Sequence, residues 1–291
     1  MHPDNFGEFL KKALLFYLNS MKIKERLDLL LVLLNLTESR QQGQKLILSG
    51  LIKVNGQIID KPGYLVSTKD QIEIIQRAPY VSRGGEKLAK ALVLFPIQVK
   101  DRICLDAGIS TGGFTDCLLQ AGVKQVYGVD VGYGQVAWSL RQDSRVVLRE
   151  RCNIRHLSLD NLYGQNDCAD LAVADLSFIS LEKVLPNLWN LLKPPREIIL
   201  LVKPQFEVGK DRVGKKGVVR DPQDHNLAIN QVNQSAIHLG WSYCGLTFSP
   251  LTGPAGNIEY FLHLKQQSQM PCLSIEKIQQ VTTEAFCFLK R

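Results

Sequence analysis

The sequence predicts an α/β protein in which a doubly wound, seven-stranded, Rossmann-like domain follows a small α+β domain. Two observations predict this fold class. From residue 82 onward, apolar strand-like runs alternate with helical patterns, which is typical of a parallel sheet with helices on both faces. Before that point, two helical patterns and a few strand-like runs share a segment that can enclose only a small core. We expect an N-terminal extension over residues 1–20, the small domain over 21–76, a linker over 77–81 and the larger domain over 82–291.

The extension contains the apolar run FLKKALLFYL. No small-residue cleavage site follows it, so we expect no removable signal peptide. No apolar run in the chain reaches the ~20 residues that a membrane span requires.

The small domain begins with ERLDLLLVLLNL, whose apolar spacing predicts a helix. SRQQGQKLILSG predicts a second helix, with Ser39 as its N-terminal cap and Gly50 at its C-terminal stop. In LIKVNGQIIDKP, β-type residues flank Asn55 and Gly56, a two-residue turn that predicts a hairpin. Val66–Ile75 is expected to form one further strand.

The larger domain is expected to open with a helix from about Glu86 and to contain helices over Pro222–Leu239 and about Ser274–Leu289. The apolar runs between and after these segments predict the strands of the sheet. They are Ile103–Ala107, Val126–Asp130, Val146–Leu148, Leu171–Asp175, Glu197–Lys203, Trp241–Phe248 and Ile258–Leu264.

The charge favours a polyanionic partner. The net charge is +7, and the first 100 residues hold 15 Lys and Arg against 9 Asp and Glu. An excess of cations concentrated in one region is typical of proteins that neutralise nucleic-acid phosphates.

The seven cysteines are odd in number and form no CxxC pair. This pattern suits buried thiols in a reducing cytoplasm better than disulfides or a zinc site. His156, His225, His238 and His263 show no metal-ligand spacing, so we expect no metal.

A glycine-rich turn marks the expected cofactor site. LDAGISTGGFTDCLL is an apolar strand that ends near Asp106, followed by a turn and a helix. Gly108, Gly112 and Gly113 allow the backbone to approach a ligand closely. The spacing differs from the dinucleotide pattern G-x-G-x-x-G and suits the amino-acid end of S-adenosyl-L-methionine (AdoMet).

Two later positions extend this site. Asp130 ends the next predicted strand, where a carboxylate can accept the hydroxyl groups of a bound ribose. Asn153 follows the third strand, where a polar side chain that contacts adenine would lie; an ordinary turn residue is the alternative.

Four ionisable residues are expected at the same sheet edge. Asp175 and Lys203 end two strands, Lys87 lies on the preceding helix, and Glu259 begins the YFLHL strand. A lysine there could stabilise a developing oxyanion as an ammonium group or, as a neutral amine, remove a proton. The sequence does not decide between these roles for Lys203.

Missing motifs favour oxygen as the methyl acceptor. Amino-group methyltransferases usually carry an Asn/Asp-Pro-Pro-aromatic turn after the fourth strand, whereas Asp175 is followed by Leu176-Ser177-Phe178. No cysteine lies at these strand ends for methylation of a base carbon.

A glycine-containing basic loop follows Lys203. It is interpreted as a flexible segment that contacts RNA phosphates, with a plain solvated loop as the alternative. Its cations are Lys210, Arg212, Lys215, Lys216 and Arg220.

These motifs resemble known families. The larger domain is similar to the RrmJ/FtsJ-type ribose methyltransferases, whose Lys-Asp-Lys-Glu tetrad matches Lys87, Asp175, Lys203 and Glu259 in order. More closely, the chain resembles the TlyA family, first named for haemolysins and regarded as ribosomal RNA 2′-O-methyltransferases that act on cytidines. The matching segments are ERLDLLL, SRQQGQKLI, KVNGQIIDKPG, YVSRGGEKLAKAL, STGGFTD, VDVGYGQVAWSLRQD, VKPQFEVGK and GVVRDP.

The resemblance implies AdoMet as cofactor, ribosomal RNA in ribosomal subunits as partner, and no membrane or metal. It also implies that the small domain is an RNA-binding domain of the S-four type. One departure is Ile109, where the family's D-V-G-A-S motif has alanine. The implied cofactor residues are Asp106, Gly108, Ser110, Gly112, Gly113, Phe114, Asp130, Asn153 and Asp175. Besides the basic loop, the implied RNA-binding residues are Arg26, Ser39, Arg40, Lys45, Lys53, Asn55 and Arg83.

Two other functions compete with this reading. A membrane-active cytolysin is suggested by the family's old name and by FLKKALLFYL, but it requires an exposed apolar surface or a secretion route. A non-catalytic ribosome-binding factor would require a decayed enzyme domain, which the complete tetrad and the glycine-rich turn argue against.

Overall fold

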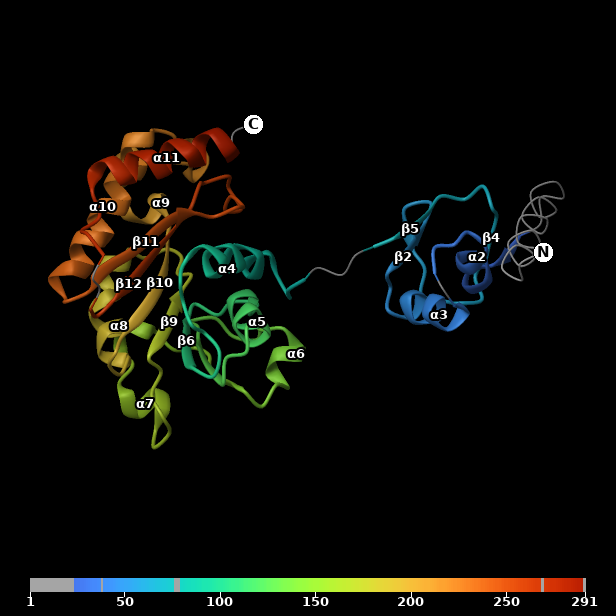
Figure 1. Ribbon diagram of the computed structural model, residues 1–291, viewed down its shortest axis with the longest axis horizontal. Coiled ribbons are helices and arrows are strands. Elements are labelled where there is room, and N and C mark those ends of the chain that lie inside the picture. Colours follow the sequence, from blue (N-terminus) through green and yellow to red (C-terminus); the bar gives the residue numbers. More distant parts are fainter. Residues whose placement is uncertain (1–23, 38, 76–78, 268–269, 290–291) are drawn as a thin grey trace, which may run out of the picture. The chain divides into compact units, whose positions relative to one another are not determined.

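The computed structural model describes residues 24–37, 39–75, 79–267 and 270–289 (Figure 1). The chain divides between Ala78 and Pro79 into two compact units, each of which is described by itself. The expected extension over residues 1–20 lies outside the described residues. Within them, no helix is both long enough and apolar enough to cross a lipid bilayer.

The N-terminal unit packs two helices and five short strands around a small apolar core. The helices are α2 (Leu27–Leu33) and α3 (Arg40–Leu48). The strands are β1 (Glu25–Arg26), β2 (Ile52–Val54), β3 (Gln57–Ile58), β4 (Leu65–Val66) and β5 (Ile72–Ile74). Strands β3, β2 and β5 form one antiparallel sheet, and β1 pairs with β4 in another. The core consists of Leu27, Leu30, Leu31, Ile47, Ile52, Val54 and Val66.

Local sequence signals in this unit are confirmed. The Ser39 hydroxyl accepts a hydrogen bond from the Gln42 amide and caps α3. Gly50 has a φ of +66° just beyond the end of α3. Asn55 and Gly56, at φ values of 50° and 81°, turn β2 into β3.

The predicted single strand over Val66–Ile75 is wrong. Two strands occupy it, and they belong to different sheets. The Asp70 carboxylate accepts hydrogen bonds from the Ser67 amide and from the Asn55 side chain, which stabilises a turn between the strands.

The C-terminal unit contains a seven-stranded sheet in the order β11-β12-β10-β9-β6-β7-β8, which confirms the predicted fold class. Strand β12 is antiparallel to both of its neighbours, β10 and β11, and the other strand pairs of this sheet are parallel. The strands are β6 (Ile103–Ala107), β7 (Gln125–Val129), β8 (Val146–Arg149), β9 (Leu171–Ala174), β10 (Glu197–Val202), β11 (Ser242–Phe248) and β12 (Tyr260–Lys265). They match the predicted ranges within two residues at either end.

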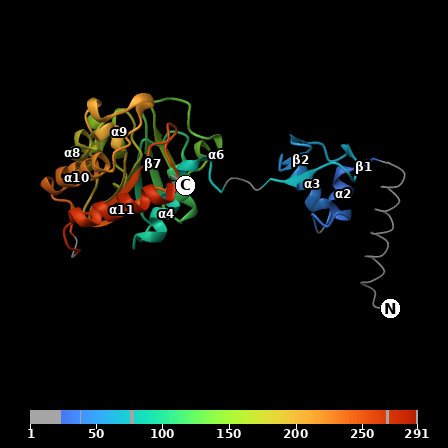
Figure 2. The ribbon, with the colours of Figure 1, turned by 90° about the horizontal axis from the view of Figure 1, so that it is seen from above.

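Helices cover both faces of this sheet (Figures 1 and 2). On one face, α4 (Arg83–Leu94) and α5 (Gly113–Gln120) pack against apolar residues such as Cys104, Leu201 and Phe261. The other face packs against α8 (Leu185–Leu191), α10 (Pro222–His238) and α11 (Ile275–Leu289). The shorter helices are α6 (Trp138–Arg141), α7 (Leu159–Tyr163) and α9 (Pro204–Glu207), with 3-10 turns η1 (Ile154–His156), η2 (Leu181–Lys183), η3 (Lys210–Arg212) and η4 (Lys215–Gly217).

Helix α4 begins three residues before the predicted start at Glu86. Glycines usually interrupt helices, but here they allow close packing. A Cβ atom on Gly85 would lie 2.2 Å from the Tyr80 ring, and one on Gly113 would lie 2.2 Å from the Ser82 hydroxyl. The glycines of α4 and α5 therefore permit the two helices to approach each other.

The prediction of buried thiols is only partly confirmed. Cys104 and Cys117 are buried, whereas Cys272 and Cys287 are exposed, because they lie on solvent-facing positions at the start and end of the C-terminal helical segment.

Candidate active site

The glycine-rich turn connects β6 to α5 at the carboxyl edge of the parallel strands. Gly108 has a φ of +90°, and a Cβ atom there would lie 2.5 Å from the Asp175 carbonyl oxygen. Gly112 has a φ of +97° and faces Leu140 of α6. Side chains at these two positions would therefore both strain the backbone and collide with neighbouring elements. The turn lies between β7 and β9, where the strand order reverses and α/β proteins form ligand sites.

The Asp130 carboxylate lies at the tip of β7 and faces this turn. It accepts hydrogen bonds from the Ser110 amide at 2.8 Å and from the Gly132 amide at 2.7 Å. These bonds fix its orientation while the residue remains partly exposed. A fixed, partly exposed carboxylate at this position can accept further hydrogen bonds from a ligand.

Two neighbouring cavities open at this edge and share Gly108, Ser110 and Asp175. One, of about 390 Å³, is lined also by Arg83, Lys87, Gly113, Phe114 and Pro254. The other, of about 490 Å³, extends past Asp130 and Asn153. The Asn153 side chain accepts a hydrogen bond from the Arg155 amide, so part of its capacity is used to cap η1.

Ile109 lines the first cavity without blocking it. Its Cδ1 would lie 2.4 Å from a Cβ atom on Gly128. The absence of a side chain at Gly128 in β7 therefore accommodates the larger residue.

Asp106 does not line either cavity. It is fully buried, and its Oδ2 accepts a hydrogen bond from the Thr115 hydroxyl at 2.6 Å. Burial raises the pKa of Asp106 to about 7, with the Thr115 hydrogen bond opposing the shift and the charges of Asp175 and Asp130 adding to it. This correction to the expected cofactor contacts arises because the side chain points from β6 toward α5 and away from the cavities.

Two lysine–carboxylate pairs converge at the same edge. Lys87 Nζ lies 2.6 Å from Glu259 Oε2, and Lys203 Nζ lies 2.5 Å from Asp175 Oδ1. Lys87 lies in α4, and Asp175 and Lys203 directly follow β9 and β10. Glu259 directly precedes β12, whereas the sequence predicted that it begins this strand. Both lysine side chains are only 9% exposed.

Glu259 interacts electrostatically with the residues of both pairs. Burial raises the pKa of the Glu259 carboxyl, the charges of Lys87 and Lys203 oppose that shift, and Asp175 adds to it. A Cβ atom on Gly253 would lie 2.6 Å from Glu259 Oε1, so the preceding loop must lack a side chain there. The arrangement brings two lysines and two carboxyl groups together at this edge; Lys87 and Asp175 line the first cavity, whereas Lys203 and Glu259 line neither of the two.

Some residues at this site were missed in the sequence. Lys203 Nζ donates a hydrogen bond to the Ser177 hydroxyl at 2.9 Å. Phe178, with a φ of 64°, is 91% exposed and packs against Phe206. Ser177 and Phe178 lie two and three residues after Asp175, so their position after a strand end was an available signal. Nothing in the sequence indicated that Pro254 would line the first cavity.

The residues expected to contact RNA have different environments. Arg26 and Arg40 both bind Asp28, and Lys45 is exposed. The Asn55 side chain is used within the unit, donating to Asp70 and accepting from the Gln71 amide. Ser39 caps α3, and Lys53 of β2 is half-buried.

The basic loop is more ordered than the sequence suggested. It forms the 3-10 turns η3 and η4, and the buried Asn257 side chain accepts from the Val219 amide and donates to the Gly217 carbonyl. All five cations are exposed; Arg212 pairs with Asp224. These bonds hold the loop at residues 217–219, and its predicted mobility and RNA contacts stay predictions.

Each of the two units matches a known protein family. Residues 80–266 match the family model of the FtsJ-like methyltransferases, and residues 25–72 match that of the S4 domain. The 16S/23S rRNA (cytidine-2'-O)-methyltransferase TlyA of Mycobacterium tuberculosis is 48% identical, over 85% of this chain and 92% of that protein. Hemolysin A of Brachyspira hyodysenteriae is 41% identical, over 78% of this chain and 94% of that protein.

A solved structure is also similar over nearly the whole chain. It carries a haemolysin name, comes from Streptococcus thermophilus and is 39% identical, with a TM-score of 0.70 over 92% of this chain and 98% of that one. Three observations lead to one conclusion. They are the order of the two matched family models, the sequence identity to TlyA, and the glycine-rich turn beside two lysine–carboxylate pairs. The chain belongs to the TlyA family of FtsJ-like methyltransferases with an S4 domain.

Proposed function

We propose that this protein transfers a methyl group from AdoMet to a ribose 2′-hydroxyl of ribosomal RNA, with a cytidine as the target nucleotide. The observation that carries the proposal is the convergence of Lys87, Asp175, Lys203 and Glu259 beside the glycine-rich turn. The reaction takes place in the cytoplasm on ribosomal subunits, and the unit that contains the S4 domain holds the RNA.

The residues present fit AdoMet. Gly108 permits close backbone approach, and Asp130 presents a fixed carboxylate that would accept the ribose hydroxyl groups of the cofactor. The cavity past Asn153 has room for the adenosine part. When bound, AdoMet supplies an electrophilic methyl group on a sulfonium centre.

Lys203 has the central role at the acceptor oxygen. Lys203 Nζ lies 2.5 Å from Asp175 Oδ1 and donates a hydrogen bond to the Ser177 hydroxyl. As an ammonium group, Lys203 would stabilise the negative charge that develops on the 2′-oxygen while the hydroxyl proton passes to water. As a neutral amine, Lys203 would instead take the proton of the 2′-hydroxyl itself.

The second pair orients the reactants. Lys87 and Glu259 are almost completely buried and are joined at 2.6 Å, so their positions are restricted. Together with Ser177, which accepts from Lys203, they hold the acceptor hydroxyl in line with the methyl group. The cations of the basic loop and Arg83 would contact RNA phosphates near the site.

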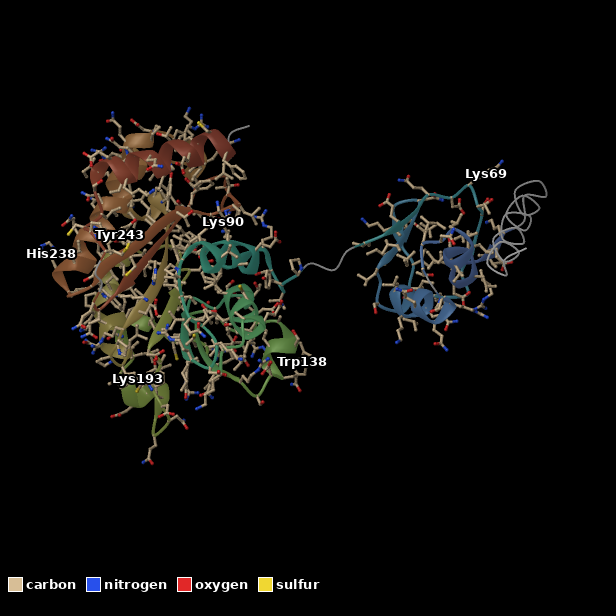
Figure 3. The ribbon with its side chains drawn as sticks, viewed as in Figure 1. Lys69, Lys90, Trp138, Lys193, His238 and Tyr243 are labelled. Atoms are coloured by element: carbon tan, nitrogen blue, oxygen red, sulfur yellow. The ribbon has the colours of Figure 1, made fainter. Side chains whose placement is uncertain are left out.

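The test is methyl transfer from labelled AdoMet to purified ribosomal subunits, followed by mapping of ribose methylation in the RNA. We expect 2′-O-methylation of a cytidine with the wild-type protein. Lys203→Ala should lower kcat at least 100-fold, because loss of one charge-stabilising group typically has this effect, while RNA binding is retained. Lys193→Ala is the matched control, since Lys193 is exposed and precedes β10, whereas Lys203 follows it (Figure 3). Unchanged turnover in Lys203→Ala would remove this residue from the mechanism.

A further inference from the structure

The N-terminal unit contains a fully buried carboxylate, Asp28, in the first turn of α2. It accepts hydrogen bonds from Arg26 Nε and Nη2, both at 3.0 Å, and from Arg40 Nε at 2.9 Å. Gln44 Nε2 donates a further bond at 2.7 Å. Four donors from three side chains therefore converge on one carboxylate.

The two arginines lie between this carboxylate and solvent. Their side chains are 42% and 48% exposed, although Asp28 is not exposed at all. Arg26 belongs to β1 and Arg40 opens α3, so Asp28 joins cations from two elements. Arg40 bonds to Asp28 through Nε, and a guanidinium group has four further N–H donors on its two terminal nitrogens.

The arrangement is held from several sides. Burial alone would raise the pKa of Asp28, but the hydrogen bonds from Arg26, Gln44 and Arg40 outweigh it and hold the pKa well below its usual range. Asp28 is therefore ionised throughout the neutral pH range. A Cβ atom on Gly63 would lie 3.1 Å from Arg26 Nη1, so the outer edge of this guanidinium also packs closely.

Arginine side chains that are held in place before a ligand arrives bind an anion more tightly. An arginine side chain loses conformational entropy when it is immobilised, which opposes binding. If Asp28 has already fixed both guanidinium groups, a bound anion need not supply that free energy. Paired guanidinium groups suit the oxygens of a phosphate.

We propose that Asp28 is a positioning residue for RNA binding, which holds Arg26 and Arg40 as one rigid pair that receives a phosphate of the RNA backbone. This inference rests on the proposed function, which requires the N-terminal unit to bind ribosomal RNA. Asp28 itself does not touch the RNA. It acts through the two arginines.

The variant Asp28→Asn separates positioning from simple charge. Removal of a negative charge should strengthen RNA binding if only the net charge matters. If Asp28 positions the arginines, the affinity for ribosomal RNA should fall about tenfold, and KM for RNA should rise while kcat at saturating RNA stays the same. The matched control is Asp60→Asn, which makes the same charge change at an exposed acid of the same unit and should leave the affinity unchanged or slightly higher.

A double-mutant cycle separates positioning from loss of folding. In full-length protein that carries Arg26→Gln and Arg40→Gln, Asp28→Asn should cause no further loss of RNA affinity. Gln44→Ala, which removes one donor to Asp28 and neither arginine, should cause a smaller loss than Asp28→Asn. An additional loss in the arginine-free background would indicate a merely structural role and would overturn the inference.

Equal or tighter RNA binding by Asp28→Asn would also overturn it. The proposed function fails in a different way, because the wild-type protein would then neither bind nor methylate ribosomal RNA. Normal methylation by the wild type together with an unaffected Asp28→Asn variant would reject only the positioning role.

Discussion

At the scale of single residues, Asp106 shows how a side chain can support a site without lining it. It lies in β6, directly before the glycine-rich turn, and its carboxylate bonds to Thr115 of α5. Its Oδ1 is buried without a hydrogen-bond partner among the described residues. The ionised form is therefore poorly solvated, which is the main reason for its raised pKa.

This raised pKa predicts a pH-dependent stability. An acid whose pKa is higher in the folded state binds more protons there, so stability falls as the pH rises from the unfolded value near 4 to about 7. Asp106→Asn removes this titration and retains an acceptor for Thr115. We expect the variant to gain stability over the wild type as the pH rises, by up to about 4 kcal/mol at pH 8, since each pKa unit corresponds to about 1.4 kcal/mol.

Urea unfolding of both proteins at pH 5, 6, 7 and 8 measures this difference. Asp143→Asn serves as control, because hydrogen bonds from Arg145 lower the pKa of Asp143, and its removal should cause no gain at high pH. A constant difference between Asp106→Asn and the wild type across this range would contradict the prediction.

At the scale of elements, the strands of the large sheet could be predicted because their buried apolar runs are continuous. The glycine-rich turn and the strand-end residues Asp130, Asp175 and Lys203 could be located for the same reason. Pairing across the chain could not be predicted. The split at Val66–Ile75 depends on Asp70 and on strand partners elsewhere, and the ordering of the basic loop depends on Asn257, 38 residues after Val219.

Asn257 therefore carries a prediction about the basic loop. Asn257→Ala removes both bonds to residues 217–219 and leaves the buried Val219 amide without this acceptor, which should destabilise the unit by about 1–3 kcal/mol. Because Lys215, Lys216 and Arg220 lie beside these bonds, we also expect KM for RNA to rise several-fold and the AdoMet affinity to change little. Steady-state methylation kinetics and calorimetry measure the two effects. Asn161→Ala, at an exposed position on α7, is the control, and an unaltered KM in Asn257→Ala would dissociate the loop from RNA binding.

At the scale of the whole molecule, the candidate active site lies in the C-terminal unit, whereas both units carry a net positive charge. The residues that line both cavities fall between Ser82 and Pro254, within the C-terminal unit. The N-terminal unit, residues 1–78, holds 11 Lys and Arg against 8 Asp and Glu, so it carries +3 of the net charge of +7 and the C-terminal unit carries the remaining +4. AdoMet binding should therefore depend on the C-terminal unit alone, whereas RNA affinity should depend on both units.

A shortened chain that begins at Gln76 tests this division. We expect it to bind AdoMet with the affinity of the full chain, because it retains every residue that lines the cavities. Its affinity for ribosomal RNA should be lower and should depend less on salt, since the slope of log K against log salt concentration falls by about 0.9 for every duplex phosphate that the protein no longer neutralises. Titrations with labelled RNA between about 50 and 200 mM salt, paired with calorimetry for AdoMet, separate the two effects. The same salt slope in the shortened and full-length chains would mean that the N-terminal cations do not bind RNA phosphates, even if the methyltransferase unit remains active.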